Sequence, residues 1–178
     1  FVYFSGEQPD STSPTIYRVP TLGGSPVKVL SNATGVTFSS DGKQLAFTRY
    51  DLPAVESSII IANADGTNER ALATLQGKRF FGFRPSWSPD GRSLAIPVAD
   101  DDLLPKPNIS VALVSTADGT IKELGDSKWS KLDEVVWHPS SDSVLIVASE
   151  NVAAPTQLWE LSYPSGTARR VTNTMIEY

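Results

Sequence analysis

The chain has 178 residues, a net charge of −5 at pH 7 and no cysteine, with 13 prolines and 12 glycines. The lack of cysteine excludes disulfides and thiolate sites. The Lys and Arg residues of the chain are scattered, which argues against nucleic-acid binding, because that function needs clustered cations. No run approaches the roughly 18 apolar residues of a spanning helix, so we expect no membrane contact from this segment. The length suits one domain over 1–178, and the many turn-forming residues suit an all-β fold.

The first 31 residues predict an incomplete unit. Residues 1–4 read as one strand, and residues 15–31 read as two further strands around a tight turn at Gly24. The 178 residues include no first strand for this unit. We therefore expect this unit to lack its innermost strand and the chain to be cut from a longer repeat array.

Three complete units are predicted next, over 35–75, 84–125 and 133–172. Each begins with a strand that ends in an aromatic residue, continues through a short polar turn and enters an apolar strand. The aromatic residues are 49 and 50 positions apart. One supersecondary unit per repeat of about 50 residues predicts the blades of a β-propeller. Structural roles in packing or in the turn are expected for Phe38, Asp41, Gly42, Trp87, Pro89, Asp90, Gly91 and Trp137.

A second tight turn recurs later in each complete unit, at Gly66, Gly119 and Gly166. Glycine suits such hairpins because it reaches positive φ without a Cβ clash, and an aliphatic strand residue stands five positions before each one. Each complete unit is therefore expected to be a four-stranded antiparallel meander. In the last unit Ser140 and Ser141 replace the Asp-Gly pair of the first turn, which leaves the geometry of that turn open.

About four blades are expected in all, three complete and one partial at the N-terminal end. An open arc of blades leaves an apolar sheet face at each end. The sequence leaves open whether the chain closes a four-bladed ring, pairs with a second copy in a larger ring, or tolerates the open arc. Self-association through the open blade ends is one of these expectations.

The longer connections between strands are expected to crowd one rim of the propeller, as in many binding surfaces on rigid scaffolds. Residues 78–84 combine three phenylalanines with three cations, and aromatic and arginine side chains are favoured at interfaces. Two interpretations stay open for the phenylalanines, which either anchor a partner or pack between blades. The candidate binding residues on this rim are Arg79, Phe80, Phe81, Phe83, Arg84, Asp101, Asp102 and Trp129.

No residue pattern in the chain indicates catalysis or metal binding. His138 is the single histidine and lies in a repeat turn, and no Gly-x-Ser-x-Gly motif is present for a Ser-His-Asp triad. The acidic run at 100–102 lacks the spacing and the glycine of a calcium loop, so a solvated loop is expected there. We therefore expect no enzyme activity, no metal and no cofactor.

The segments Trp87–Gly91 and Ala64–Gly66 resemble the TolB-type, WD-like propeller repeat of bacterial proteins. Residues 157–173 are also similar to propeller tails of bacterial membrane-anchored serine/threonine kinases and winged-helix regulators. The resemblance implies a non-catalytic binding or sensor module, outside the cytoplasm and tethered by a membrane helix elsewhere, that presents one rim to a protein or small ligand. The same repeat occurs in the N-terminal propeller of prolyl oligopeptidase-like peptidases, which makes an accessory peptidase propeller the alternative.

Overall fold

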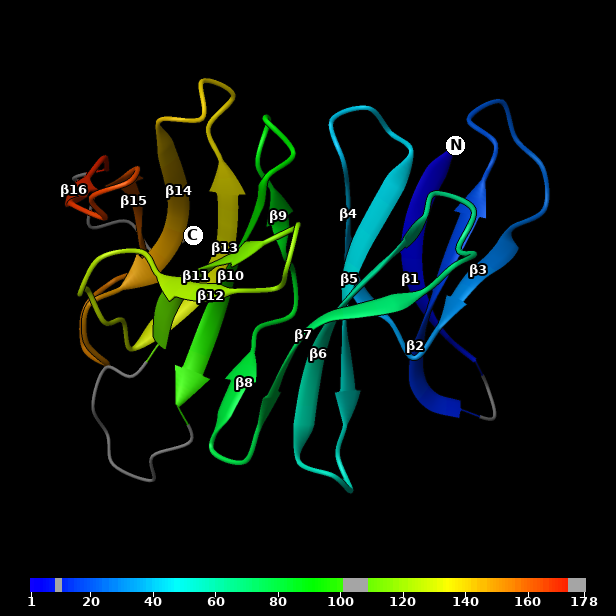
Figure 1. The fold of residues 1–178 in the computed structure, drawn as a ribbon, viewed down its shortest axis with the longest axis horizontal. Helices are drawn as coiled ribbons and strands as arrows, with labels where there is room; N and C mark the ends of the chain where they lie inside the picture. Colours follow the sequence, from blue (N-terminus) through cyan, green and yellow to red (C-terminus); the bar gives the residue numbers. More distant parts are fainter. Residues whose placement is uncertain (9–10, 101–108, 173–178) are drawn as a thin grey trace.

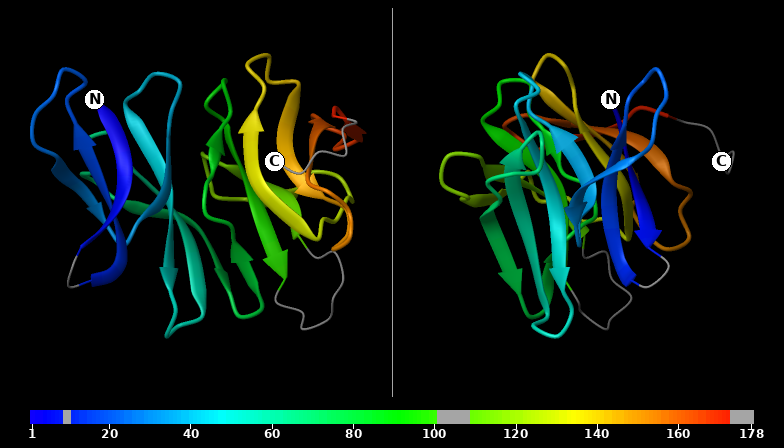
Figure 2. Two further views of the ribbon diagram at one scale, coloured as in Figure 1. Left: turned by 180° about the vertical axis from the view of Figure 1, so that it is seen from behind. Right: turned by 90° about the vertical axis from the view of Figure 1, so that its right-hand side faces the viewer.

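The computed structural model describes residues 1–8, 11–100 and 109–172, whose strands form four antiparallel sheets; these residues contain no helix. The sheets, which we call blades one to four, follow one another along the long axis of the molecule (Figure 1). The view from behind shows the same succession, and the view along the long axis shows the blades one behind another (Figure 2). The predicted all-β, partial β-propeller fold is confirmed.

Blade one has three strands in the described residues and lacks the inner strand, whereas blades two and four are complete four-stranded meanders. Blade one contains β1 (Val2–Gln8), β2 (Ser11–Val19) and β3 (Val27–Ser31). Blade two contains β4 (Thr34–Phe38), β5 (Gln44–Asp51), β6 (Glu56–Asn63) and β7 (Arg70–Gln76). Blade four contains β13 (Lys131–Trp137), β14 (Ser143–Ser149), β15 (Gln157–Ser162) and β16 (Ala168–Arg170).

Blade three has an inner edge that is split between two short strands. β8 (Arg79–Phe81) and β9 (Ser86–Trp87) both pair with β10 (Ser93–Asp100). The sheet continues through β11 (Ile109–Ser115) to β12 (Ile121–Glu123). The prediction that residues 78–84 are entirely a loop is therefore wrong. The free edge of β10 supplies partners for backbone groups of 79–81, which would otherwise need water.

Apolar residues of consecutive blades pack in three clusters, one for each junction. Alternation along β5 shows how one strand serves two junctions, because successive side chains point to opposite faces. Leu45 and Phe47 pack towards blade one, whereas Ala46 packs towards blade three. Trp87 and Trp137 are buried in the next two clusters, and Phe38 packs partly buried against the first.

The second turn of each complete blade packs on the outer part of the blade before it. At Gly119, where φ is +75°, an added Cβ would lie 2.0 Å from the carbonyl oxygen of Leu72 in β7. The matching glycines behave alike, with an added Cβ 2.7 Å from Val29 O at Gly66 and 2.3 Å from Gly125 at Gly166. These glycines therefore have two roles: they adopt the positive φ that the turn needs, and their lack of a Cβ lets the neighbouring blade approach closely.

The first turn of blade three is held by its own side chains. Ser88 Oγ donates to Asp90 Oδ1 at 2.6 Å, and the backbone N–H groups of Arg92 and Ser93 donate to Asp90 and Ser88. The hydrogen bonds from the Ser88 hydroxyl and from the Arg92 N–H hold the pKa of Asp90 below its usual value. Blade four keeps a tight turn without glycine, because Ser141 adopts φ 64°.

Apolar side chains are exposed on the outward faces of the first and last blades. Val2 and Phe4, which alternate with the inward-facing Tyr3, are exposed on blade one, and Val136 is exposed on blade four. These are the two open faces expected of an arc of blades. Self-association through them stays a prediction.

Candidate binding site: a hollow on the loop rim

The two ends of the blades carry different kinds of connection. In Figure 1 the short polar turns β4–β5 and β13–β14 lie along the upper edge, whereas the β5–β6 hairpin and the β7–β8 turn lie along the lower edge. We call the lower edge the loop rim. Neighbouring connections from different blades meet there, as expected for antiparallel meanders placed side by side.

The loop rim contains a hollow of about 680 Å³ where the first three blades meet. We call it the rim hollow. The β5–β6 hairpin forms one side and residues 80–83 form another, while Pro14 and Asn32 contribute from blade one and from its link to blade two. Two of the predicted binding residues, Phe80 and Phe83, line it.

The floor of the rim hollow is fixed by hydrogen bonds from blade two to the segment at 81–82. Tyr50 Oη donates to the carbonyl oxygen of Phe81 at 2.8 Å, and Thr48 Oγ1 donates to that of Gly82 at 3.1 Å. The N–H of Phe81 donates to Ser57 Oγ at 2.9 Å. Burial raises the pKa of Tyr50 far above neutrality, so its hydroxyl stays a donor. The floor is therefore rigid before any ligand arrives.

The walls of the rim hollow are apolar and exposed. Leu52 is 81% exposed and Phe83 is 72% exposed, and Val55 and Phe80 are also exposed. The Phe83 ring meets the Tyr50 ring edge to face, with centroids 5.7 Å apart. Large apolar side chains gathered around one hollow are typical of a binding site, whereas single exposed ones are ordinary.

Val55 has a strained backbone at the lip of this hollow. Its φ is 51°, in the left-handed region that β-branched residues rarely adopt. Its N–H donates to Leu52 O at 3.1 Å and its carbonyl accepts from the Gly77 N–H at 3.0 Å, so bonds on both sides hold it there. Such strain often accompanies functional sites.

The two predicted cationic candidates are engaged within the chain. Arg79 forms ion pairs of 2.8 Å with Asp100 and with Glu123, both in blade three. Arg84 Nη1 lies 3.0 Å from Glu134 Oε1 in blade four. Both side chains thus join strands of the fold, and their part in binding stays a prediction. Asp101 and Asp102 lie outside the described residues.

Phe81 and Trp129 lie in the core: Phe81 follows the interpretation in which the phenylalanines pack between blades, and the assignment of these two residues as binding residues on the rim is wrong. Phe81 is 0% exposed because β8 is a strand and turns this side chain inward. Trp129 is 2% exposed; its backbone bridges to Ile109 and its ring meets Trp159 edge to face at 4.8 Å. Neither side chain is accessible to a partner.

Sequence reasoning missed the hairpin Asp51–Glu56, which supplies most of one wall. Its signal was visible in the sequence, because Leu52 and Val55 are large apolar residues in a hairpin turn, where polar residues are usual. The contribution of Tyr50 had no such signal, since its hydroxyl bond to Phe81 depends on how two blades pack.

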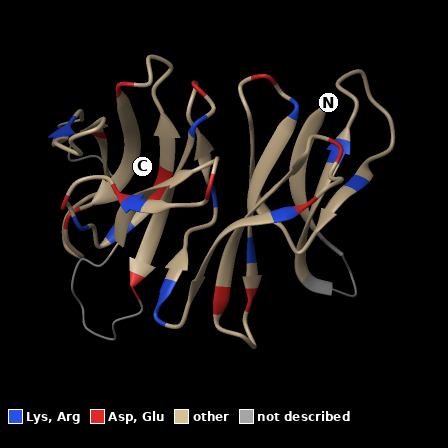
Figure 3. Ribbon diagram, viewed as in Figure 1, with Lys and Arg blue, Asp and Glu red and all other residues tan. Residues whose placement is uncertain are grey.

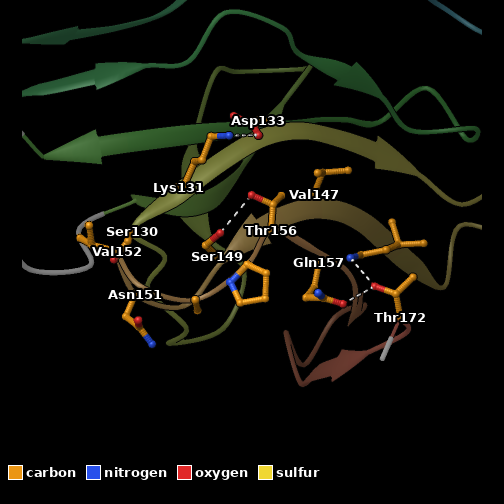
Figure 4. A pocket seen from close by; sticks show the side chains of 13 residues that line it. Ser130, Lys131, Asp133, Val147, Ser149, Asn151, Val152, Thr156, Gln157 and Thr172 are labelled. Atoms are coloured by element: carbon orange, nitrogen blue, oxygen red, sulfur yellow. Dashed lines mark hydrogen bonds and ion pairs between the residues drawn. The ribbon is translucent and has the colours of Figure 1, made fainter. Parts of the chain in front are cut away.

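A second hollow, of about 810 Å³, lies beside blade four (Figure 4). Its polar groups largely satisfy one another, as Thr172 Oγ1 donates to Gln157 Oε1 at 2.7 Å and the Ser149 and Thr156 hydroxyls lie 3.1 Å apart. Val147 and Leu158 pair across β14 and β15 on the face turned away from blade three. This hollow therefore lies on the open end face of blade four and extends to the connection between β14 and β15.

The turn of blade four brings a histidine, a serine and an aspartate together in a non-catalytic order. The Ser140 hydroxyl donates to Asp142 Oδ1, and His138 Nδ1 lies 2.5 Å from the same hydroxyl. A nucleophilic triad needs the histidine between serine and carboxylate, so this arrangement serves the turn. Bonds from Ser140 and Ser143 lower the pKa of Asp142.

Charges are spread over all four blades in Figure 3 and form no single-sign face in that view. Among residues 1–8, 11–100 and 109–172, no three His, Asp or Glu side chains are placed to hold a metal ion. The same residues include no helix that could cross a bilayer. The rim hollow combines exposed apolar walls with a hydrogen-bonded floor, and we therefore take it as the candidate site in the described part of the chain.

Comparison with known proteins agrees with this architecture. The structure matches TolB from Acinetobacter baumannii with a TM-score of 0.73 and 16% identity, covering 90% of this chain and 38% of that one. The chain has the TolB-type β-propeller fold. The propeller domain of the trilobed protease from Pyrococcus furiosus matches with a TM-score of 0.63 and 16% identity, covering 98% of this chain and 53% of that one.

One curated protein shares recognisable sequence with the chain. Dipeptidyl-peptidase 5 from Porphyromonas gingivalis is 25% identical over 160 residues, which is 86% of this chain and 23% of that protein. No family model matches the chain. The chain thus spans less than two thirds of each of these proteins, and it shares with the solved structures a fold at low sequence identity.

Proposed function

We propose that this chain is a non-catalytic binding module that takes up an apolar segment of a partner protein in the rim hollow. The observation that carries the proposal is the gathering of four exposed apolar side chains above a floor that three hydrogen bonds hold rigid. A preformed floor lowers the ordering cost of binding, and exposed apolar walls supply its driving force.

The module belongs, in this proposal, to a larger bacterial sensor or scaffold protein outside the cytoplasm. The fold similarity to TolB agrees with that setting. Arg79 and Arg84 stand next to the lining residues Phe80 and Phe83 in sequence, and their ion pairs with Asp100 and Glu134 link strands of blade three and join blade three to blade four.

A selection from random displayed peptides on the purified chain tests the proposal. We expect enriched peptides whose binding weakens at least about tenfold in the double variant Leu52→Ser with Phe83→Ser, because anchor residues dominate binding energy. The matched control is Leu22→Ser with Val152→Ser, since both residues are highly exposed and neither lines the rim hollow. Equal binding to all three proteins would contradict the proposal.

A second candidate function is an accessory propeller of a prolyl oligopeptidase-like peptidase. The sequence similarity to dipeptidyl-peptidase 5 supports it. The coding sequence around this segment separates the two candidates. A following hydrolase domain with a Gly-x-Ser-x-Gly motif would favour the peptidase, whereas a kinase or DNA-binding module with one membrane helix would favour the sensor.

A further inference from the structure

The charges at the mouth of the rim hollow indicate what kind of segment it takes. Asp51 and Glu56 stand directly opposite each other at the last rung between β5 and β6, and both line the hollow. Side chains of directly opposed residues project to the same face of a hairpin, where like charges repel. The hairpin therefore holds two carboxylates side by side at the entrance to an apolar space.

Hydrogen bonds fix these carboxylates without neutralising them. Asp51 Oδ1 accepts from the N–H of Ala54 at 3.1 Å, and Glu56 Oε2 accepts from the side-chain amide of Gln76 at 2.9 Å. These donors are uncharged, as is the Ser58 hydroxyl that donates to Glu56 Oε1 at 3.3 Å, so none of these hydrogen bonds brings a compensating positive charge. Within the described part of the chain, no Lys or Arg nitrogen forms an ion pair with either of them.

The arginines of the neighbouring strands are committed elsewhere. Arg49 pairs with Glu69 at 2.8 Å, and Arg79 and Arg84 form the ion pairs with blades three and four described above. Lys78 lies in the adjoining turn and is exposed, and it makes no ion pair with Asp51 or Glu56. A cationic group of a ligand would therefore reduce the repulsion between the Asp51 and Glu56 carboxylates, which no cation of the described residues pairs with.

Resting on the function proposed above, we propose that the rim hollow binds an arginine side chain of a partner polypeptide, flanked by apolar residues. The guanidinium meets Asp51 and Glu56 in charge-assisted hydrogen bonds, and its aliphatic stem lies along Leu52 and Phe83. Arginine suits the site better than lysine, because its planar head stacks on an aromatic ring and forks to two acceptors.

Two peptides of seven residues, acetylated and amidated, test this inference on the purified chain. One has a central arginine between leucines, and the other has citrulline, a neutral isostere, in its place. Titration followed by fluorescence polarisation is expected to give roughly tenfold tighter binding for the arginine peptide at low salt, with a smaller advantage at high salt. The advantage should disappear in the double variant Asp51→Asn with Glu56→Gln.

The matched control is the double variant Asp126→Asn with Glu150→Gln. It changes the net charge equally, and its residues are exposed in other connections and do not line the rim hollow. The control should keep the full preference for arginine. A preference that falls equally in both variants, or in neither, overturns the inference.

The remaining outcomes separate this inference from the proposed function. If both peptides bind equally and both are lost in Leu52→Ser with Phe83→Ser, the apolar site stands and the arginine inference fails. Failure of both peptides to bind also overturns it. Binding of free arginine amide or spermidine as tightly as the arginine peptide would identify a small cation as the occupant and overturn the assignment to a polypeptide.

Discussion

The junctions on either side of blade three reach the loop rim with aromatic side chains, yet one is open and the other closed. Between blades two and three, Phe80 and Phe83 are exposed at the rim hollow. Between blades three and four, Trp129 is buried against Trp159. The connection at 79–81 is a strand, so alternation must turn one of two adjacent phenylalanines outward. The connection before β13 makes only a single bridge, at Trp129, and is free to turn that ring inward.

Truncating one aromatic residue at each junction is the strongest way to break this comparison. We expect Trp129→Ala to lower the free energy of unfolding by about 3–5 kcal/mol, because it empties a buried site. Phe83→Ala should cost about 1 kcal/mol or less, since it loses little besides its edge contact with Tyr50. Urea unfolding of both variants measures the difference. Similar losses would mean that the two junctions are packed alike.

A pair of glycine substitutions tests the outer part of the junctions, where the turn of one blade packs closely on the blade before it at every junction. Gly42 and Gly119 have φ of +68° and +75°, but an added Cβ meets nothing within 4 Å at Gly42 and meets Leu72 O at Gly119. Gly42→Ala should therefore cost only the left-handed backbone penalty, about 1 kcal/mol.

Gly119→Ala should cost roughly 1–3 kcal/mol more than Gly42→Ala, because the neighbouring blade must move to admit the methyl group. Thermal unfolding of the two variants provides the measurement. Equal losses would show that the turn alone, and not the contact between blades, requires glycine at this position.

The sequence allowed the blade pattern to be predicted because that pattern depends on local chemistry. The turn from Ser88 to Ser93 closes through its own side chains, and strand alternation follows from neighbouring residues. The burial of Phe81 depends on pairing with Val98, and the second role of Gly119 depends on Leu72. Contacts between residues so distant in sequence leave no local signal. The rim hollow, built from three blades, was predicted only at Phe80 and Phe83 for the same reason.

On the rim opposite the hollow, the third and fourth blades can be compared through their first turns. Ser141 holds φ 64° at the position where blades two and three have glycine. Ser141→Gly should raise the free energy of unfolding by about 1 kcal/mol, because glycine adopts this conformation without the Cβ clash. Differential scanning calorimetry against the parent chain checks the sign. An unchanged or lower melting temperature would mean that Ser141 makes a compensating contact in this turn.

The smallest expected effect is the dependence of stability on acid pH, which tests the role of Asp90 in the first turn of blade three. The pKa of Asp90 is lower in the folded chain than its usual value near 3.8, so the folded state favours the ionised carboxylate. Its contribution is fully present above the unfolded pKa and is lost as the pH falls through the folded pKa. Asp90→Asn should therefore be less stable than the parent near pH 6, by less than about 1 kcal/mol at this exposed site. The gap should close as the pH drops below the folded value. Urea unfolding of both proteins between neutral and acid pH measures this difference in the free energy of unfolding. A difference that does not change with pH would show that the shape of the Asp90 side chain, and not its charge, supports the turn.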